Sequence, residues 1–416
     1  MDIVRRPLAE RVLRPPAARV TIIEGARAVG KTTMVTHELV PQGYSYQSLA
    51  SPATLALARA DLEPWLAHLE LPAIIDEAQL LPGLPLAVKE RVDGLGRANS
   101  FVLTGSASIG RHGLGGADPL VRRAQRFTLR PLTGWELSRT PGCLVDWLFD
   151  ADIAPARLAP VPEETLRAHV SIGGFPDYAL ATPPPAPESL SRWVQSDITG
   201  LLTDTVLPET DYSAMIARAV LNGLLTLPGS IFNASRLSGL LGVDRRTIDR
   251  YLGILGRLFL VHWLPNLAVA PQRQDHTRAK VHPVDSSFAV AALRASGVDL
   301  ATNRELFGQV VESWVVNQIV AAGDWASTAV SAHYWRDSAT AQEVDLVLTD
   351  ERGRRLGIEV KASRVYDSHQ IRGLRALEHD RGLHRGFVVY LGDELFPVAE
   401  NIWLLPVSVL TSGPPS

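Results

Sequence analysis

A glycine-rich segment that ends in lysine and threonine carries the strongest chemical signal in the chain. Residues 25–32 read Gly-Ala-Arg-Ala-Val-Gly-Lys-Thr and match the spacing G-x-x-x-x-G-K-S/T at every fixed position. Glycines let the backbone curl so that successive N–H groups and the N-terminus of a following helix point at one anion. Lys31 can then reach the β- and γ-phosphates of a nucleotide, and the Thr32 hydroxyl can bind Mg²⁺. The segment predicts a phosphate-binding loop between a strand and a helix, with ATP and Mg²⁺ as cofactors.

Two acidic residues, Asp76 and Glu77, follow the apolar residues Ile74 and Ile75. This pattern predicts a buried parallel strand whose carboxyl end lies at the ligand edge of a sheet. Asp76 is expected to help hold Mg²⁺, and Glu77 to orient or deprotonate the attacking water. An apolar strand that ends in two acids is common by itself, but its place after a phosphate loop makes it a second motif of the same site.

A third apolar strand, residues 101–106, ends in hydroxyl groups and glycine. Thr104 or Ser106 is a candidate for contacting the γ-phosphate, and the alternative is an ordinary strand exit. Four arginines follow, and one of them could stabilise a phosphoryl transition state unless they form a solvated basic helix. These arginines are Arg122, Arg123, Arg126 and Arg130. The predicted nucleotide-binding residues are Gly25, Ala26, Arg27, Ala28, Val29, Gly30, Lys31, Thr32, Thr33, Asp76 and Thr104.

A second group of residues that could do chemistry lies near the C-terminus. Glu359 and Lys361 stand two positions apart in an apolar segment, so strand geometry places both on one face. Asp345, near the start of the preceding predicted strand, can approach that face, and Glu312 lies on a helix before it. Asp345 and Glu359 beside Lys361 would form a Mg²⁺ site with a group to polarise water, as metal-assisted phosphodiester cleavage requires. An E-x-K pair on a solvated strand is the alternative, and the preceding acidic helix and strand argue against it.

Residues 231–266 predict a helix, a glycine turn and a second helix. Gly242 makes the turn, Asp244 is placed to cap the second helix, and residues 259–264 could form a wing strand. The first helix carries on one face Leu237, Leu240 and Leu241. The second carries the basic residues Arg245, Arg246 and Arg250. These arginines would face DNA phosphates or base edges, whereas Asp244 and Asp249 dilute their charge and favour a winged helix used only for packing.

Length and composition bound the domain count and the class of protein. At 416 residues the chain is too long for one ordinary core, and we expect three domains at 1–145, 146–270 and 271–416. A single cysteine, Cys143, excludes an intrachain disulfide and a cysteine-rich zinc site. A net charge of −3 argues against wholesale wrapping of nucleic acid but allows a local basic face. No segment has the length of a membrane span and the N-terminus lacks an apolar signal region, so a cytoplasmic protein with no membrane partner is expected.

Taken in order, these motifs resemble a large family of prokaryotic AAA-type P-loop ATPases, whose members carry a C-terminal domain of uncharacterised function. The resemblance rests on residues 25–33, 74–79, 103–106, 131–132 and 173–176. It implies an α/β fold with a P-loop parallel sheet, a helical and winged-helix middle region, and a C-terminal domain similar to the PD-(D/E)xK nucleases. In that signature the ionisable positions are filled by Glu312, Asp345, Glu359 and Lys361.

The leading hypothesis is an ATP-hydrolysing protein whose nucleotide state controls a Mg²⁺-dependent, nucleic-acid-directed nuclease-like domain. The expected catalytic residues are Glu77, Glu312, Asp345, Glu359 and Lys361, and the expected metal ligands are Thr32, Asp76, Asp345 and Glu359. One alternative is a nucleotide-dependent switch or scaffold whose nuclease-like domain is catalytically silent, and another is a winged-helix DNA-binding regulator. Nucleic acid, DNA before RNA, is the expected partner, and both a homo-oligomer and a protein partner stay open.

Overall fold

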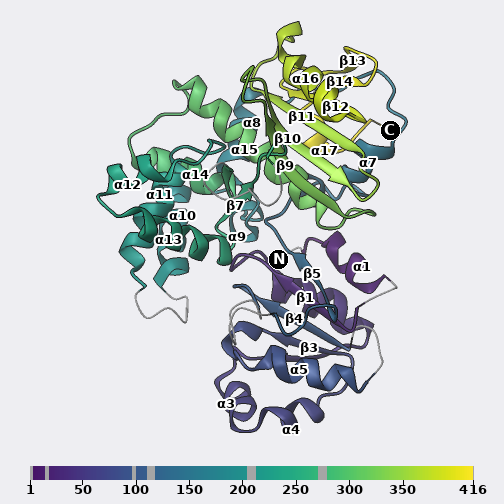
Figure 1. Cartoon of the computed structure of the whole chain (residues 1–416), viewed down its shortest axis with the longest axis vertical. Coiled ribbons are helices and arrows are strands. Elements are labelled where there is room, and N and C mark those ends of the chain that lie inside the picture. The colour runs from purple at the N-terminus through teal and green to yellow at the C-terminus, as the bar shows by residue number, and fades with distance from the viewer. Residues whose placement is uncertain are drawn as a thin grey trace. The chain divides into compact units, whose positions relative to one another are not determined.

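The chain divides into two compact units, each described below by itself (Figure 1). The computed structural model describes residues 3–14, 18–95, 100–109, 118–203, 212–269 and 279–415. The first unit comprises Met1–Arg130 with Arg257–Phe259, and the second comprises Pro131–Gly256 with Leu260–Ser416. Among the described helices, none is both long and apolar enough to cross a membrane.

The first unit contains a sheet of five parallel strands in the order β2-β3-β4-β1-β5 (Figure 1). The strands are β1 (Val20–Glu24), β2 (Ser45–Ser48), β3 (Ala73–Asp76), β4 (Phe101–Gly105) and β5 (Ala124–Thr128). Every residue of β1, β3 and β4 is buried, as expected for apolar strands of a parallel sheet covered on both faces. The three strands expected before the phosphate loop, before Glu77 and before Ser106 are confirmed, and β4 pairs with both of the others.

The first unit also contains helices. They are α1 (Pro7–Leu13), α2 (Lys31–Met34), α3 (Pro52–Ala60), α4 (Leu62–Ala67) and α5 (Leu84–Asp93). Of these, α2 contacts β4 and α3 contacts β2. A π-helical turn, Val35–Leu39, continues α2, so the helix expected after the phosphate loop is present. α5 buries Leu84, Val88 and Val92 in the same core cluster as Ile22 and Ile75 of the sheet.

The second unit contains a mixed seven-stranded sheet in the order β6-β13-β14-β12-β11-β10-β9. Its strands are β6 (Ala156–Arg157), β9 (Val330–Arg336), β10 (Glu343–Asp350), β11 (Arg355–Lys361), β12 (Arg385–Tyr390), β13 (Glu394–Pro397) and β14 (Ile402–Pro406). β9, β10 and β11 are antiparallel neighbours, and β11, β12 and β14 run parallel. The expected turn between β10 and β11 is present, and Asp350 closes it by accepting hydrogen bonds from the backbone of Arg352 and Arg354 at 3.0 and 2.8 Å.

Helices form the rest of the second unit. They are α6 (Gly134–Leu137), α7 (Leu144–Asp150), α8 (Glu163–Ile172), α9 (Pro176–Ala179), α10 (Pro187–Thr203), α11 (Ala214–Leu225), α12 (Ala234–Leu241), α13 (Arg245–Arg257), α14 (Ser286–Ala295), α15 (Arg304–Gly323), α16 (Arg372–Arg381) and α17 (Ser408–Ser412). α15 and α16 both pack on β10 and β11. After α13 the chain forms an antiparallel ribbon of β7 (Val261–Leu264) and β8 (Lys280–Pro283).

The helix, glycine turn and second helix expected between residues 231 and 266 are present as α12, Gly242 and α13. Gly242 ends α12 with φ 64°, and Asp244 accepts a hydrogen bond from the Thr247 N–H at 3.0 Å, as expected of a cap. The leucine face divides, because Leu237 is buried whereas Leu240 is 75% exposed. α12 is therefore anchored by its first turns, and its last turn faces solvent.

Candidate functional sites

The phosphate loop of the first unit joins β1 to α2 through two glycines that the geometry requires. A Cβ atom on Gly25 would lie 2.1 Å from the backbone oxygen of Leu129, so no side chain fits there. Gly30 has φ 93°, a left-handed conformation that favours glycine, and stands immediately before α2. The loop backbone is thereby curled at the N-terminus of a helix, which is the arrangement that binds phosphate.

Lys31 is folded back onto the loop that it follows. Its Nζ donates hydrogen bonds to the backbone oxygens of Gly25 and Ala26 at 2.9 and 2.8 Å, and the residue is only 5% exposed. Burial lowers the pKa of the Lys31 ammonium to about 8, against the opposing effect of the Glu77 and Asp76 carboxylates. The ammonium is thus held beside the anion cradle by carbonyl groups that phosphate oxygens could replace.

Asp76 collects hydroxyl groups from three elements. Thr32 and Tyr46 donate to its Oδ2 at 2.8 and 2.9 Å, and the buried Thr104 hydroxyl donates to its Oδ1. Burial and the hydrogen bond to Asp76 raise the pKa of Tyr46 to about 12. The structure therefore brings Thr32, Asp76 and Thr104 together as predicted, and Thr104 positions Asp76. Tyr46 was missed because nothing in its own segment marks it.

Glu77 is held by side chains on both sides. It has φ 56°, and its carboxylate accepts hydrogen bonds from the Gln79 side-chain amide and from Ser106 Oγ, the latter at 3.1 Å. The Gln79 amide also donates to Ser106 at 3.0 Å. Ser106, the other candidate for contacting the γ-phosphate, is thus a partner of Glu77 in this structure.

Arginines of the first unit are engaged by its own acids and carbonyls. Arg126 pairs with Glu24 and Asp118 at 2.9 and 2.6 Å, and Arg123 pairs with Asp93 at 2.6 Å. The Arg6 guanidinium, which belongs to no recognised motif, is 3% exposed and donates hydrogen bonds to the backbone oxygens of Val29 and Arg130 at 2.9 and 2.6 Å. Arg6 therefore fixes the phosphate loop to the segment after β5.

The residues at this edge fit ATP with Mg²⁺. Hydroxyl and carboxylate oxygens are the ligands that Mg²⁺ prefers, and Thr32 and Asp76 present them 2.8 Å apart. The curled glycine loop and Lys31 supply the donors that phosphate oxygens need.

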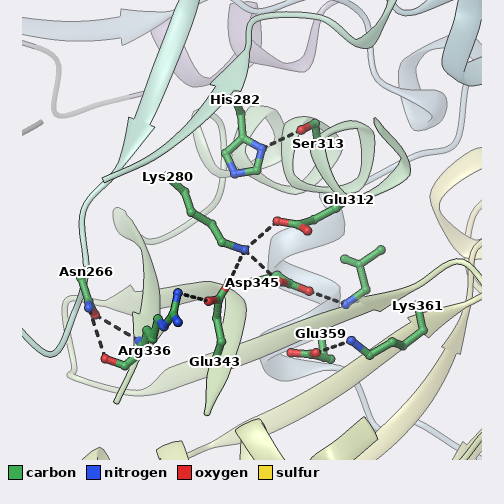
Figure 2. Close-up of polar contacts among 11 residues, drawn as sticks. Asn266, Lys280, His282, Glu312, Ser313, Arg336, Glu343, Asp345, Glu359 and Lys361 are labelled. Carbon is green, nitrogen blue, oxygen red and sulfur yellow. Dashed lines mark hydrogen bonds and ion pairs between the residues drawn. The ribbon is translucent and has the colours of Figure 1, made fainter. Parts of the chain in front are cut away.

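The second unit brings all four predicted acidic and basic residues to one cluster, with two residues that the sequence did not reveal (Figure 2). The Lys280 ammonium of β8 lies 2.8 Å from Glu312 of α15, 2.6 Å from Glu343 and 3.0 Å from Asp345, both of β10. Lys280 is 3% exposed. Its partners lie far away along the chain, so no local pattern connects them.

Glu359 and Lys361 of β11 complete the cluster. Lys361 Nζ lies 2.5 Å from Glu359 Oε1, and Asp345 Oδ2 accepts the backbone N–H of Val360 at 2.9 Å (Figure 2). Glu359 Oε2 is buried and has no hydrogen-bond partner among the described residues. The strand pairing predicted for Asp345 and Glu359 is therefore realised across β10 and β11.

The pKa values of the carboxylates in the cluster are shifted in opposite directions. Burial raises the pKa of Glu312 to about 8 and that of Glu359 well above its usual value. Burial also acts to raise the pKa of Asp345, but Lys280, Lys361 and the Val360 N–H outweigh it, and the pKa is lowered. The carboxylates likewise outweigh the burial of Lys280 and raise its pKa.

The cluster as arranged does not fit Mg²⁺. One oxygen of Asp345 is bonded to Lys280 and the other to Val360 N–H, so neither is directed at an additional cation. Within the described ranges, no group of three or more His, Cys, Asp or Glu side chains has the arrangement of a metal site. The Lys280 ammonium contacts Asp345, one of the two expected metal ligands, and takes an oxygen that the metal would need.

The segments 131–132 and 173–176 also meet, in the interior of the second unit. Gly174 N–H donates to the buried Asp285 carboxylate at 2.7 Å, and its backbone oxygen accepts the Leu132 N–H at 2.7 Å. A Cβ atom on Gly174 would lie 2.1 Å from the Leu132 oxygen. These segments hold the helical part together and carry no group for catalysis.

Family models match three parts of the chain. Residues 17–138 match the model of a family described as an AAA domain, whereas residues 163–299 and 307–410 match two domains of unknown function, DUF8612 and DUF4143. None of the curated proteins compared with the chain matches it.

Three solved structures illustrate the structural likeness. A Walker-type ATPase of Pyrococcus abyssi is 13% identical with a TM-score of 0.45, covering 70% of this chain and 98% of its own. RuvB of Thermotoga maritima is 17% identical with a TM-score of 0.29, covering 62% and 86%. AMPPCP-bound DnaA of Aquifex aeolicus is 12% identical with a TM-score of 0.30, covering 60% and 86%. The family match and the phosphate-loop geometry together show that the first unit carries an AAA-type P-loop ATPase domain.

Proposed function

We propose that the chain hydrolyses ATP at the phosphate loop and uses its nucleotide state to control a nucleic-acid-directed second unit. One observation carries the first part: Lys31, Thr32, Asp76 and Glu77 converge at one edge of a parallel sheet. They lie beside the phosphate loop, in which Gly25 has no room for a side chain. This set combines an anion cradle, oxygen ligands for a cation and a carboxylate for water.

The residues would act in the following way. Lys31 exchanges its two carbonyl partners for phosphate oxygens, and Thr32 and Asp76 hold the metal ion. Mg²⁺, when bound, neutralises charge on the phosphates. Glu77 orients the attacking water, and Gln79 and Ser106 keep its carboxylate in place.

ATP turnover tests this assignment. Lys31→Ala should lower the rate by about 10² or more, because a preorganised cation is lost from the site of developing charge. Lys89→Ala, a lysine of α5 in the same unit, is the matched control and should turn over like wild type. Unchanged turnover in Lys31→Ala would refute the assignment.

The element order α11, α12, α13, β7, β8 supports a winged helix in the second unit, and an isolated bridge between Ile231 and Lys280 stands where its first strand would pair. Arg245, Arg246 and Arg250 are exposed on α13, although Arg245 lies 3.7 Å from Asp249. We propose that this face binds the phosphates of DNA. The division into domains at 1–145, 146–270 and 271–416 belongs to the same proposal.

Salt-dependent DNA binding tests that face. Arg246→Ala should weaken binding of duplex DNA and reduce the slope of log K against log salt by about 1, because one phosphate contact is lost. Arg381→Ala, exposed on α16, serves as a control of equal charge. Equal slopes in both variants would exclude α13 as the DNA-binding helix.

For the C-terminal part, a nuclease-like PD-(D/E)xK arrangement is supported by Asp345 on β10 and by Glu359 and Lys361 on β11. The position of Lys280 favours the alternative in which this domain is catalytically silent and the protein acts as a nucleotide-dependent switch. Cleavage of DNA or RNA that needs a divalent ion and disappears in Asp345→Ala would decide for the nuclease.

A further inference from the structure

Three carboxylates from two elements converge on a single point of the second unit, and a lysine fills it. Lys280 Nζ lies 2.6 Å from Glu343, 2.8 Å from Glu312 and 3.0 Å from Asp345 (Figure 2). Such convergence of carboxylate oxygens is how proteins hold Mg²⁺ or Ca²⁺. Here the cation is a side chain delivered by β8, the strand that pairs with β7.

The rest of the cluster contains carboxylate oxygens that a cation could bind. Glu359 Oε2 is buried without a partner in the described part of the chain, and the residue is 9% exposed. Asp345, on the neighbouring strand, accepts a hydrogen bond from Lys280 with one of its oxygens. With the Lys280 ammonium removed, Glu312 and Asp345 would each gain a free oxygen and lose the cation that contacts them, and Glu359 Oε2 would remain without a partner in the described part of the chain.

Lysine usage in the chain supports a specific role for this ammonium. The chain contains only four lysines, Lys31, Lys89, Lys280 and Lys361, and its other basic residues are arginines. Three of the four lie in the two sites described above. An ammonium is a compact point charge with three donors, which suits a point between three carboxylates, whereas a planar guanidinium does not.

We propose that the Lys280 ammonium is the resident cation of this cluster and excludes a divalent ion, and that its removal opens a divalent-cation site formed by Glu312, Asp345 and Glu359. The inference stands on the geometry of the second unit and does not depend on ATP hydrolysis. If Lys280 excludes the divalent ion, the C-terminal domain is the catalytically silent one of the switch hypothesis and not a metal-dependent nuclease.

Mn²⁺ binding to the full chain without nucleotide, measured by the EPR signal of free Mn²⁺, tests the proposal. Lys280→Met should gain one Mn²⁺ site per chain that wild type lacks. Asp345→Asn in the Lys280→Met background should abolish the gain, and Lys89→Met should bind Mn²⁺ like wild type.

A second, charge-balanced variant tests the proposal if Lys280→Met does not fold. Lys280→Met with Glu343→Gln removes one charge of each sign, keeps the three proposed ligands and should show the same gain. Wild type that binds a Mn²⁺ ion sensitive to Asp345→Asn would overturn the proposal, because Lys280 would then exclude nothing. A folded Lys280→Met or double variant with no gained site would overturn it as well.

Discussion

At the scale of single residues, the first site depends on hydroxyl groups that fix carboxylates. Asp76 accepts from Thr32, Tyr46 and Thr104, and Glu77 from Ser106 and Gln79. Groups that orient a metal ligand affect metal affinity even though they never touch the ion. Thr104 and Ser106, on the same strand end, thus serve different carboxylates and should have separable effects.

Thr104→Val should raise the Mg²⁺ concentration required for ATP turnover by about 10- to 100-fold, because Asp76 loses a buried donor while the side-chain volume is kept. Ser106→Ala should instead lower kcat with little change in the Mg²⁺ requirement, because Ser106 contacts Glu77. Mg²⁺ titrations of steady-state turnover measure both. An unchanged Mg²⁺ requirement in a folded Thr104→Val protein would contradict this division of roles.

The same scale shows why the sequence predicted most residues of each site and missed the others. Lys31, Asp76 and Glu77 stand beside apolar strands whose ends mark them, so spacing alone finds them. Lys280 meets Glu312 and Asp345, which are 32 and 65 residues further along the chain, and Tyr46 meets Asp76 across 30 residues. Such contacts form only when the strands are placed in a sheet, so the local periodicity of the sequence does not predict them.

At the scale of elements, the strands, helices and turns that border the sites could be predicted, whereas the contacts between distant segments could not. β10 and β11 follow from apolar runs joined by Arg352-Gly353-Arg354, and α13 from the cap at Asp244. The sequence marks residues 131–132 and 173–176 as two separate segments and does not predict that they contact each other. The basis of this contact is steric, since the backbone oxygen of Leu132 occupies the space that a side chain on Gly174 would need.

Gly174→Ala should therefore reduce the free energy of unfolding of the second unit by about 1–3 kcal/mol, because the added methyl group meets rigid backbone. Gly239→Ala is the matched control. It lies within α12 with nothing inside 4 Å of the added Cβ, and should stabilise by up to about 1 kcal/mol through helix propensity. Urea unfolding of both variants measures the difference, and equal stabilities would refute the steric explanation.

At the scale of the whole molecule, the proposed switch requires that nucleotide bound to the first unit alter the second. Cys143 is the only cysteine of the sequence, and its reactivity can be used to follow the second unit. It stands before α7, and its Sγ donates to the backbone oxygen of Ala322 in α15 at 3.3 Å. Burial raises the pKa of its thiol to about 12. Its alkylation at pH 8 should thus be about 10³-fold slower in the native chain than in the unfolded chain, because the thiolate reacts.

Alkylation faster than this native rate then measures opening of the second unit. ATP analogue at 100 times its Kd stabilises whatever unfolds together with the phosphate loop by about 2.7 kcal/mol, which lowers the open population about 100-fold. A coupled switch predicts slower alkylation with the analogue in wild type and no slowing in Lys31→Ala, which cannot hold the phosphates. If wild type is alkylated at the same rate with and without the analogue, the units open independently. Control of the second unit by ATP would then require hydrolysis or a bound nucleic acid to connect them.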